Sequence, residues 1–329
     1  MSPPLRIVLT GNFHENPTML AFRHAFHKLG HKTTEVWVEN YYRVGLLNRW
    51  TNRLLSPVAP TPDFWGTKKY QEALLKAVCQ TEPHVVICAD PILVSPATLQ
   101  LIKIRTNAAL LSWLSCDVFL PENGSRFFYD AISQYDCHFS GVPSNFSELI
   151  ANGAKHVEEV SPAVIPIPNS IRRRAPDKKS FGVGVFGRRS HLTELVLTHF
   201  RRNHIAVTQF ATLEPEKLSP LYQNLLIAIP TSKEANFVVP ALGALVLFPR
   251  ENSFNDLFRE GIEADYFGGM EELVSKVKYY LSHSERCSQI ARQGLERARR
   301  PDLCFESQAA AVVTVVRRHF LNEASRLSG

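Results

Sequence analysis

Short apolar runs alternate with longer amphipathic stretches along the first half of this chain. In the longer stretches, such as 19–29 and 95–104, apolar residues recur at the spacing of one helix face. Strands that alternate with helical segments of this length are typical of a parallel sheet with helical crossovers. The apolar runs predict strands at 6–10, 33–38, 84–88, 108–113, 133–139 and 156–160.

The same pattern begins again in the second half. A predicted strand at 182–186 leads through a turn at 187–190 into a predicted helix at 192–203. Between the halves, the stretch 161–168 holds three prolines, which do not fit a central strand or a helix interior. We therefore predict a first domain over 1–165, a linker over 166–180, a second domain over 181–304 and a terminal helix over 305–329.

The composition also fits two folded domains. The chain has 329 residues, 45% of them apolar, and one hydrophobic core seldom extends over so many residues. Lys plus Arg exceed Asp plus Glu by 37 − 31 = 6. Basic residues concentrate in 172–189, where they would attract a nucleoside diphosphate, a nucleic acid or an acidic membrane surface. A solvated linker with many charges is the alternative explanation of 172–179.

Cysteine usage predicts a reduced, cytoplasmic protein. The six cysteines are scattered and form no Cys-x-x-Cys pair. The sequence does not start with a basic region and a long apolar stretch, and the longest apolar run, 309–316, is far shorter than the roughly 20 residues of a membrane helix. Neither an Asp-x-Asp element nor a His, Cys and carboxylate group with metal-ligand spacing is present. We expect no membrane span and no tightly held metal, while peripheral membrane contact stays open.

Polar residues follow two predicted strands of the first half, at the edge where open α/β sheets bind ligands. Gly11 and Asn12 follow the first strand, and Asp90 follows the third. Asp90 is therefore a candidate for a hydrogen bond to a sugar, although an aspartate before proline also starts turns.

Three residues compete as the general base of a reaction at this edge. His14 has a reference pKa of about 6.5, which suits proton abstraction near neutral pH. Glu15 and Asp117 are the carboxylate alternatives. For Asp117, a role as a helix or turn cap explains the residue equally well.

The segment Gly182–Gly187 matches the Gly-x-Gly-x-x-Gly pattern of dinucleotide sites, but that pattern needs a strand before its glycines. Here the predicted strand contains the glycines, and Val207–Gln209 stands where the ribose-binding acid belongs. We predict instead that Gly187 forms a turn from strand to helix. Arg188 and Arg189 would then lie at a helix amino terminus, where amides and the helix dipole favour a diphosphate. An exposed basic turn without a ligand is the alternative.

A series of different short motifs follows in a fixed order along roughly residues 20–310. The motifs are His27-Lys28-Leu29-Gly30-His31, Glu82-Pro83-His84-Val85-Val86, Trp113 with Asp117, Tyr135-Asp136 with Phe139, Asn152-Gly153-Ala154, Phe186-Gly187-Arg188, Phe258 with Gly261, Glu263 and Phe267, Leu273 with Tyr280-Leu281, and Glu285-Arg286 with Ile290-Ala291 and Gly294. In their order and spacing, these motifs resemble the spore-maturation-type (CgeB-like) glycosyltransferases of the two-domain GT-B class.

The resemblance implies two Rossmann-like parallel-sheet domains that face a central cleft, with the terminal helix bracing back to the first domain. It further implies transfer of a sugar from a nucleotide-activated donor, such as a UDP-sugar, without a metal or other cofactor. The donor would bind the second domain at Gly187, Arg188 and Arg189, with Gly243 shaping its pocket. An unknown glycan, protein or small molecule would bind the first domain as the acceptor.

The sequence departs from the family at the donor site. Members usually carry an Arg-x-Phe-Glu-like element before an Ala-x-Gly-Ala turn, and the acid is expected to bind the donor ribose. Here Ala235–Val238 stands at that place and lacks both charges. A lost hydrogen bond to a charged group costs about 1.5–3 kcal/mol. Lys233 and Glu234, just before this segment, are candidate substitutes.

Three functions remain open on the sequence alone. The first is a metal-independent glycosyltransferase, and the second is an inactive GT-B-like binding or scaffolding protein, which the altered donor motif would explain. Nucleic-acid binding through 172–189 is the third, but single-strand binding needs aromatic residues among the basic ones, and only Phe181 and Phe186 are near. The donor sugar, the acceptor, the stereochemical outcome and the oligomeric state are not encoded in these motifs.

Overall fold

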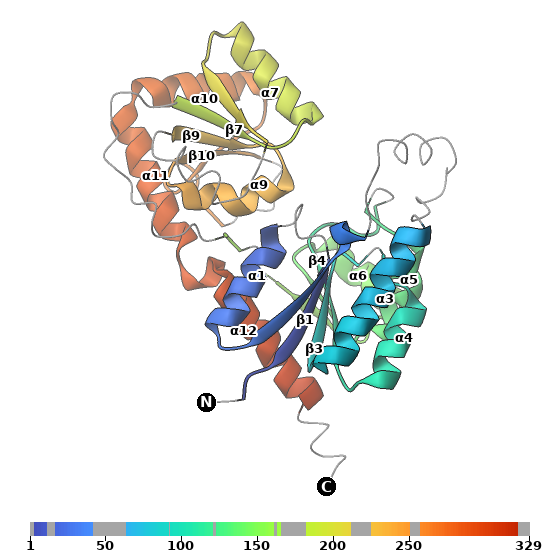
Figure 1. The fold of residues 1–329 in the computed structure, drawn as a ribbon. Coiled ribbons are helices and arrows are strands. Elements are labelled where there is room, and N and C mark those ends of the chain that lie inside the picture. The colour runs from blue at the N-terminus through green and yellow to red at the C-terminus, as the bar shows by residue number, and fades with distance from the viewer. Residues whose placement is uncertain are drawn as a thin grey trace. The chain divides into compact units, whose positions relative to one another are not determined.

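A computed structural model describes residues 3–11, 17–41, 64–91, 93–120, 123–160, 163–165, 182–211, 225–250 and 257–321. The chain divides into two compact units (Figure 1). Unit 1 comprises Met1–Ser161 with Gln308–Gly329, and unit 2 comprises Pro162–Ser307. The predicted linker, 166–180, lies outside the described residues, as does most of the basic cluster 172–189.

Unit 1 is built on a parallel sheet that has six strands within the described residues, in the order β2-β1-β3-β4-β5-β6 (Figure 1). The central strands are apolar and buried along almost their whole length, as expected when helices cover both faces of a sheet. The strands are β1 (Arg6–Gly11), β2 (Lys32–Trp37), β3 (Val85–Ala89), β4 (Ala109–Leu114), β5 (Cys137–Ser140) and β6 (Val157–Glu159).

The strand predicted at 133–139 is wrong in its first part. Ile132–Gln134 forms a 3₁₀ turn, and β5 begins only at Cys137. Asp136, just before β5, accepts a hydrogen bond from the amide of Leu110 at 2.8 Å and forms an ion pair with Lys103 at 2.8 Å. These bonds fix the entry of β5 beside β4, which the apolar pattern alone does not reveal.

Helices cover both faces of the first sheet (Figure 1). Those on one face, α3, α4 and α5, lie opposite α1 and α12 (Phe305–Val316) on the other face. Ser95 begins α4 by accepting a bond from the amide of Thr98 at 3.2 Å, as predicted for a helix cap. The helices of unit 1 are α1 (Pro17–Lys28), α3 (Phe64–Thr81), α4 (Pro96–Arg105), α5 (Arg126–Ala131) and α6 (Ser144–Ala151).

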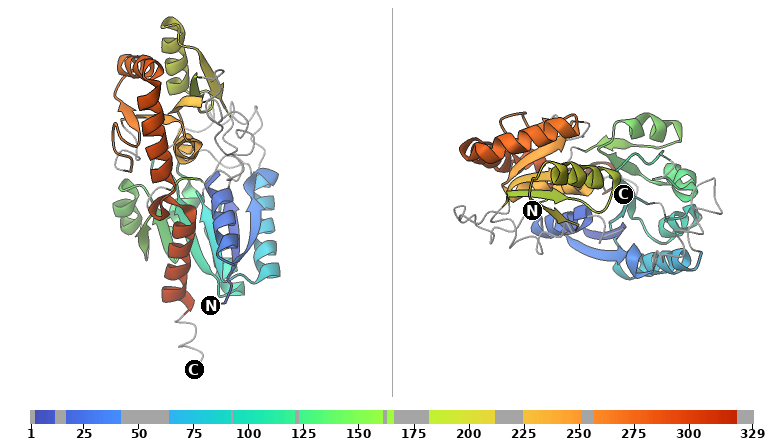
Figure 2. Two further views of the ribbon diagram at one scale, coloured as in Figure 1. Left: turned by 90° about the vertical axis from the view of Figure 1, so that its left-hand side faces the viewer. Right: turned by 90° about the horizontal axis from the view of Figure 1, so that it is seen from above.

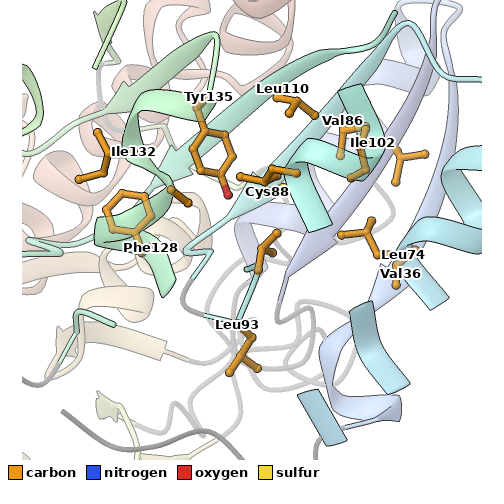
Figure 3. Packing of buried hydrophobic residues seen from close by; sticks show 14 of the residues in the cluster. Val36, Leu74, Val86, Cys88, Leu93, Ile102, Leu110, Phe128, Ile132 and Tyr135 are labelled. Carbon is orange, nitrogen blue, oxygen red and sulfur yellow. The ribbon is translucent and has the colours of Figure 1, made fainter. Parts of the chain in front are cut away.

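The core beneath α3, α4 and α5 is largely apolar, with a few polar groups inside it (Figure 3). Tyr135 and Cys88 are both fully buried in it, and burial raises the pKa of the Cys88 thiol to about 12. The hydroxyl of Tyr70 bonds that of Thr10 at 2.6 Å, which connects α3 to β1. These buried groups stay protonated at neutral pH and act as packing residues.

Unit 2 repeats the design with a sheet of five strands among its described residues, in the order β11-β10-β9-β7-β8. All described pairings are parallel. Helix α9 covers one face, and α7 and α10 cover the other (Figure 1). The elements are β7 (Gly182–Phe186), α7 (His191–Arg202), β8 (Val207–Phe210), β9 (Leu225–Pro230), α9 (Lys233–Val238), β10 (Leu245–Pro249), β11 (Asp265–Phe267), α10 (Met270–Ser282) and α11 (Ser284–Ala298).

Several motifs that carry the family resemblance stabilise unit 2. Glu263 accepts bonds from the amide and the guanidinium of Arg259, at 3.0 and 2.8 Å. Gly294 of α11 packs so closely on the Glu263 carbonyl that a Cβ at this position would collide with it. The Tyr280 hydroxyl donates to the buried Asp265 carboxylate at 2.6 Å. These contacts stabilise the fold of unit 2.

The described part of the chain ends with α12 (Phe305–Val316) and a π-helical turn, Arg317–Leu321. The last part of this segment belongs to unit 1, where it lies beside the sheet (Figure 2). Arg317 donates to the carbonyl of Pro3 at 2.8 Å, and the rings of His319 and His156 lie 5.6 Å apart. Among the described helices, none combines the length and apolar character that a membrane crossing requires.

Candidate functional site

Each sheet contains one point where the strand order reverses. In unit 2 the chain leaves β7 for its neighbour β8 and then returns to β9 on the other side of β7. Open α/β sheets bind ligands outside the carboxyl ends of the strands at this point. Gly187 follows β7 there, and Thr231 follows β9. The strand order thus brings together two loops that are far apart in sequence.

Two of the glycines in Gly182–Gly187, Gly184 and Gly187, allow close packing in unit 2. A Cβ on Gly184 would come within 2.9 Å of the rings of Phe186 and Phe210, which stack with centroids 4.7 Å apart. A Cβ on Gly187 would collide with the Thr231 hydroxyl. Close approach between the two loops therefore requires a residue without a side chain at 187. Packing thus explains two of the three glycines that match the dinucleotide pattern, whereas a Cβ on Gly182 would meet no atom within 4 Å.

The turn after β7 leads directly into α7, as predicted. Ser190 is the N-cap, and its hydroxyl accepts from the amide of Thr193 at 3.1 Å. The Ser190 carbonyl accepts from the amide of Glu194 at 3.0 Å. The amides of His191 and Leu192, earlier in the first turn, have no acceptor within the helix because of their position. The positive end of the helix dipole thus lies next to Arg188 and Arg189.

Both arginines of this turn are exposed. Arg189 pairs with Glu194, whose carboxylate oxygen lies 2.7 Å from Nε. This hydrogen bond and the opposite charge raise the pKa of Arg189 and lower the pKa of Glu194. The ion pair is solvent-exposed and therefore weak, so an incoming anion can compete with Glu194 for the guanidinium.

Three hydroxyl groups connect the two loops beneath this surface. Thr193 and Thr231 are buried, and their hydroxyl oxygens lie 2.8 Å apart. Ser190 Oγ lies 2.9 Å from the Thr193 hydroxyl. Neither threonine was predicted from the sequence. The available signals were a polar pair, Thr231-Ser232, directly after an apolar strand, and the Ser-x-x-Thr spacing at the start of α7.

Of the other predicted donor-side residues, Gly243 lies apart from this turn. Gly243 ends a 3₁₀ turn with φ 70°, at the amino end of β10, whereas Gly187 lies at the carboxyl end of the parallel strand β7. The two glycines are therefore at opposite edges of the sheet. Lys233 and Glu234 form the first turn of α9, next to Thr231 and its neighbour Ser232; their side chains are outside the described part of the structure.

The altered donor motif falls on α9. Ala235 and Val238 are completely buried, and Ala235 packs in the apolar cluster on this face of the sheet. A carboxylate at either position would have to enter the core, where an unpaired charge is strongly unfavourable. The absence of charge at these two positions therefore follows from how α9 packs here.

In the first sheet the strand order reverses between β1 and β3, and Gly11 and Asp90 lie at this point. A Cβ on Gly11 would come within 2.9 Å of Ala89. Asp90 adopts the left-handed conformation, with φ 41°, and its carboxylate accepts bonds from the amide and hydroxyl of Ser115 at 2.9 and 2.6 Å. Asn12, the candidate base His14 and Glu15 all lie outside the described residues.

Asp117 stabilises a turn. One carboxylate oxygen accepts from the amide of Phe119 at 3.0 Å, and the other accepts from the Ser144 hydroxyl at 2.7 Å. Its side chain thus makes the turn-capping contacts that were the alternative to a catalytic role. Within the residues that the structure describes, no three His, Cys, Asp or Glu side chains are grouped as metal ligands.

Comparisons with known proteins agree with this architecture. Residues 182–310 match the model of a protein family described as glycosyl transferase-like. The sucrose-phosphate synthase of Thermosynechococcus elongatus superposes with a TM-score of 0.63 at 11% identity, covering 97% of this chain and 100% of that one. HepE of Anabaena, solved with UDP-glucose, gives a TM-score of 0.62 at 11% identity over 94% of this chain and 100% of its own. The chain has the GT-B fold.

Another solved structure, a glycosyltransferase of Rickettsia africae, has a TM-score of 0.61 at 10% identity and covers 96% of this chain and 99% of that chain. No curated protein matches this chain in sequence. Identities near 10% establish the shared fold alone. The match to the family model covers most of unit 2, the unit that contains the Gly187 turn.

Proposed function

We propose that this protein is a glycosyltransferase that uses a nucleotide-activated sugar and binds the donor diphosphate at the β7–α7 turn. The observation that carries the proposal is the convergence at the switch point of unit 2: the close approach of Gly187 to Thr231, the amino terminus of α7 and two exposed arginines. The matched family model, 182–310, includes this turn. HepE, with the same fold, was solved with UDP and with UDP-glucose.

In the proposed reaction, the bond between the sugar and the diphosphate breaks while the acceptor hydroxyl attacks the sugar. Negative charge then builds up on the leaving diphosphate. The helix dipole, the first-turn amides of α7 and the guanidinium groups of Arg188 and Arg189 would stabilise this charge without a metal ion. Such groups act strongly because they are in position before the reaction begins.

The acceptor is assigned to the edge of the first sheet, near Gly11, Asn12 and Asp90. His14 is the proposed general base, because the carboxylate of Asp117 is already engaged by Phe119 and Ser144. The donor ribose needs a partner other than 235 and 238, whose side chains are buried. Glu234, in the first turn of α9 next to the switch point, is the proposed acceptor for the ribose hydroxyls.

Calorimetry and a product assay on the full-length protein test the proposal. UDP, GDP and ADP are titrated separately, and release of the nucleoside diphosphate is followed with a panel of nucleotide sugars, each with and without EDTA. We expect one nucleoside diphosphate to bind and to raise the unfolding temperature, with turnover that EDTA does not abolish. Replacement of Arg188 and Arg189 by Gln should weaken binding.

Three outcomes separate the alternatives. Failure of all three nucleotides to bind would reject the donor site. Tight binding without release from any donor would favour a binding protein over an enzyme. Turnover that disappears with EDTA and returns with a divalent cation would reject the metal-independent mechanism.

A further inference from the structure

The turn after β7 has its carbonyl groups engaged within unit 2. The Phe186 carbonyl accepts from the amide of Thr231 at 2.7 Å, and the Gly187 carbonyl accepts from Gln209 Nε2 at 3.2 Å. The Arg188 carbonyl accepts from the Thr193 hydroxyl at 2.8 Å. Three successive carbonyl oxygens, each with partial negative charge, are thus held by hydrogen-bond donors of the protein.

Holding a carbonyl also orients the next amide. A trans peptide is planar and places its C=O and N–H on opposite sides. The bond from Thr193 to the Arg188 carbonyl therefore fixes the N–H of Arg189 on the far side of that peptide. Loss of this bond would allow the peptide to rotate and to turn its oxygen, instead of its N–H, toward a bound anion.

Thr193 occupies the centre of the hydroxyl chain, and its side chain is fully buried. Its one hydroxyl proton has three possible acceptors, the Arg188 carbonyl and the Thr231 hydroxyl at 2.8 Å and Ser190 Oγ at 2.9 Å. Thr231 in turn lies 3.1 Å from the Phe186 carbonyl and can donate there or to Thr193. When Thr231 and Ser190 both donate to the Thr193 oxygen, the Thr193 proton is directed to the Arg188 carbonyl, and the peptide between Arg188 and Arg189 is fixed.

We propose that Thr193 is a positioning residue for a nucleoside diphosphate. Through the Arg188 carbonyl it keeps the Arg189 amide directed toward the anion, although its own buried side chain does not touch the ligand. This inference rests on the proposed function, because it assumes that the β7–α7 turn binds the diphosphate. Thr231 has a different role: its amide holds the Phe186 carbonyl even without its hydroxyl.

The experiment compares variants of the full-length protein by calorimetric titration with UDP and with UMP. Thr193→Val keeps the shape and removes the hydroxyl, and Thr193→Ser keeps the hydroxyl. We expect Thr193→Val to bind UDP about tenfold more weakly, which is the loss of one buried hydrogen bond. Thr193→Ser should stay within about twofold of the unaltered protein. The UMP affinity should change less than the UDP affinity, because UMP lacks the second phosphate.

Two controls distinguish positioning from a general loss of stability. Tyr266→Phe removes another buried hydroxyl bond of unit 2, to the Phe258 carbonyl at 2.7 Å, and should lower the unfolding temperature without changing the UDP affinity. Thr193→Ser is the second control, because it removes only the methyl group and keeps the hydroxyl. Thr193→Ala replaces Thr193→Val if the latter does not fold.

Unchanged UDP binding by Thr193→Val would overturn the inference. Equal weakening by Thr193→Val and Thr193→Ser, or by Thr193→Val and Tyr266→Phe, would also overturn it. If the unaltered protein binds neither UDP, GDP nor ADP, the proposed function itself fails, which the titration of the unaltered protein shows before any variant is made.

Discussion

His138 makes unit 1 sensitive to acid. This residue of β5 is completely buried, and its two ring nitrogens bond Ser112 Oγ at 2.7 Å and the Ile132 carbonyl at 3.0 Å. Since a carbonyl only accepts, Nε2 carries the proton, and in the neutral ring Nδ1 accepts from Ser112. Burial lowers the pKa of His138 to about 4 from its usual 6.5, although the bond to Ile132 partly opposes the change.

The lowered pKa determines both the sign and the size of the effect. Between pH 6.5 and about pH 4 the unfolded chain binds a proton that the folded protein excludes, so stability falls as the pH decreases through this window. One pH unit corresponds to about 1.36 kcal/mol. The contribution of His138, complete above pH 6.5, should therefore decrease by about 3 kcal/mol on reaching pH 4.

The measurement compares the protein with His138→Gln, which keeps a donor for the Ile132 carbonyl but does not titrate. All four tryptophans, at positions 37, 50, 65 and 113, belong to the sequence of unit 1. Tryptophan fluorescence during urea unfolding therefore reports on this unit. The stability difference between the two proteins should shrink by about 3 kcal/mol from pH 7 to pH 4. A difference that stays constant over this range would refute the reasoning, whatever its size.

Three further predictions concern the β7–α7 turn. Gly187→Ala should destabilise unit 2 by about 1–3 kcal/mol and abolish UDP binding, because the new Cβ collides with the loop after β9. In the control variant Gly269→Ala the new Cβ meets no atom within 4 Å, so stability and UDP binding should both be preserved. Urea unfolding measures the stability of the two variants, and calorimetry measures their UDP binding. Arg188→Gln should weaken UDP binding about tenfold and reduce its dependence on salt, and an unchanged salt dependence would contradict a direct charge contact. Glu194→Gln should increase UDP affinity about two- to fivefold at low salt by releasing Arg189, and unchanged or weaker binding would show that the two do not compete.

The alternation of apolar and amphipathic segments was sufficient to predict two α/β units with parallel sheets. This information is local: side-chain periodicity distinguishes strands from helices, and Ser95 and Ser190 begin helices through bonds to amides three residues later. For the same reason the sequence predicted the turn at Gly187 and the start of α7. It failed at 133–136, where Asp136 bonds Leu110 of the neighbouring strand, a contact between residues far apart in sequence.

Only the tertiary structure decided which loops meet. Thr193 and Thr231 are 38 residues apart, and they become neighbours because β9 lies beside β7. The same strand order puts Gly243 at the opposite edge of the sheet, and the packing of α9 buries Ala235 and Val238. Strand order depends on the paths of the helical crossovers and on the packing of whole layers, and these are long-range properties. A periodic sequence therefore specifies the elements of this protein, while the composition of its candidate site follows from how those elements are ordered in the sheet.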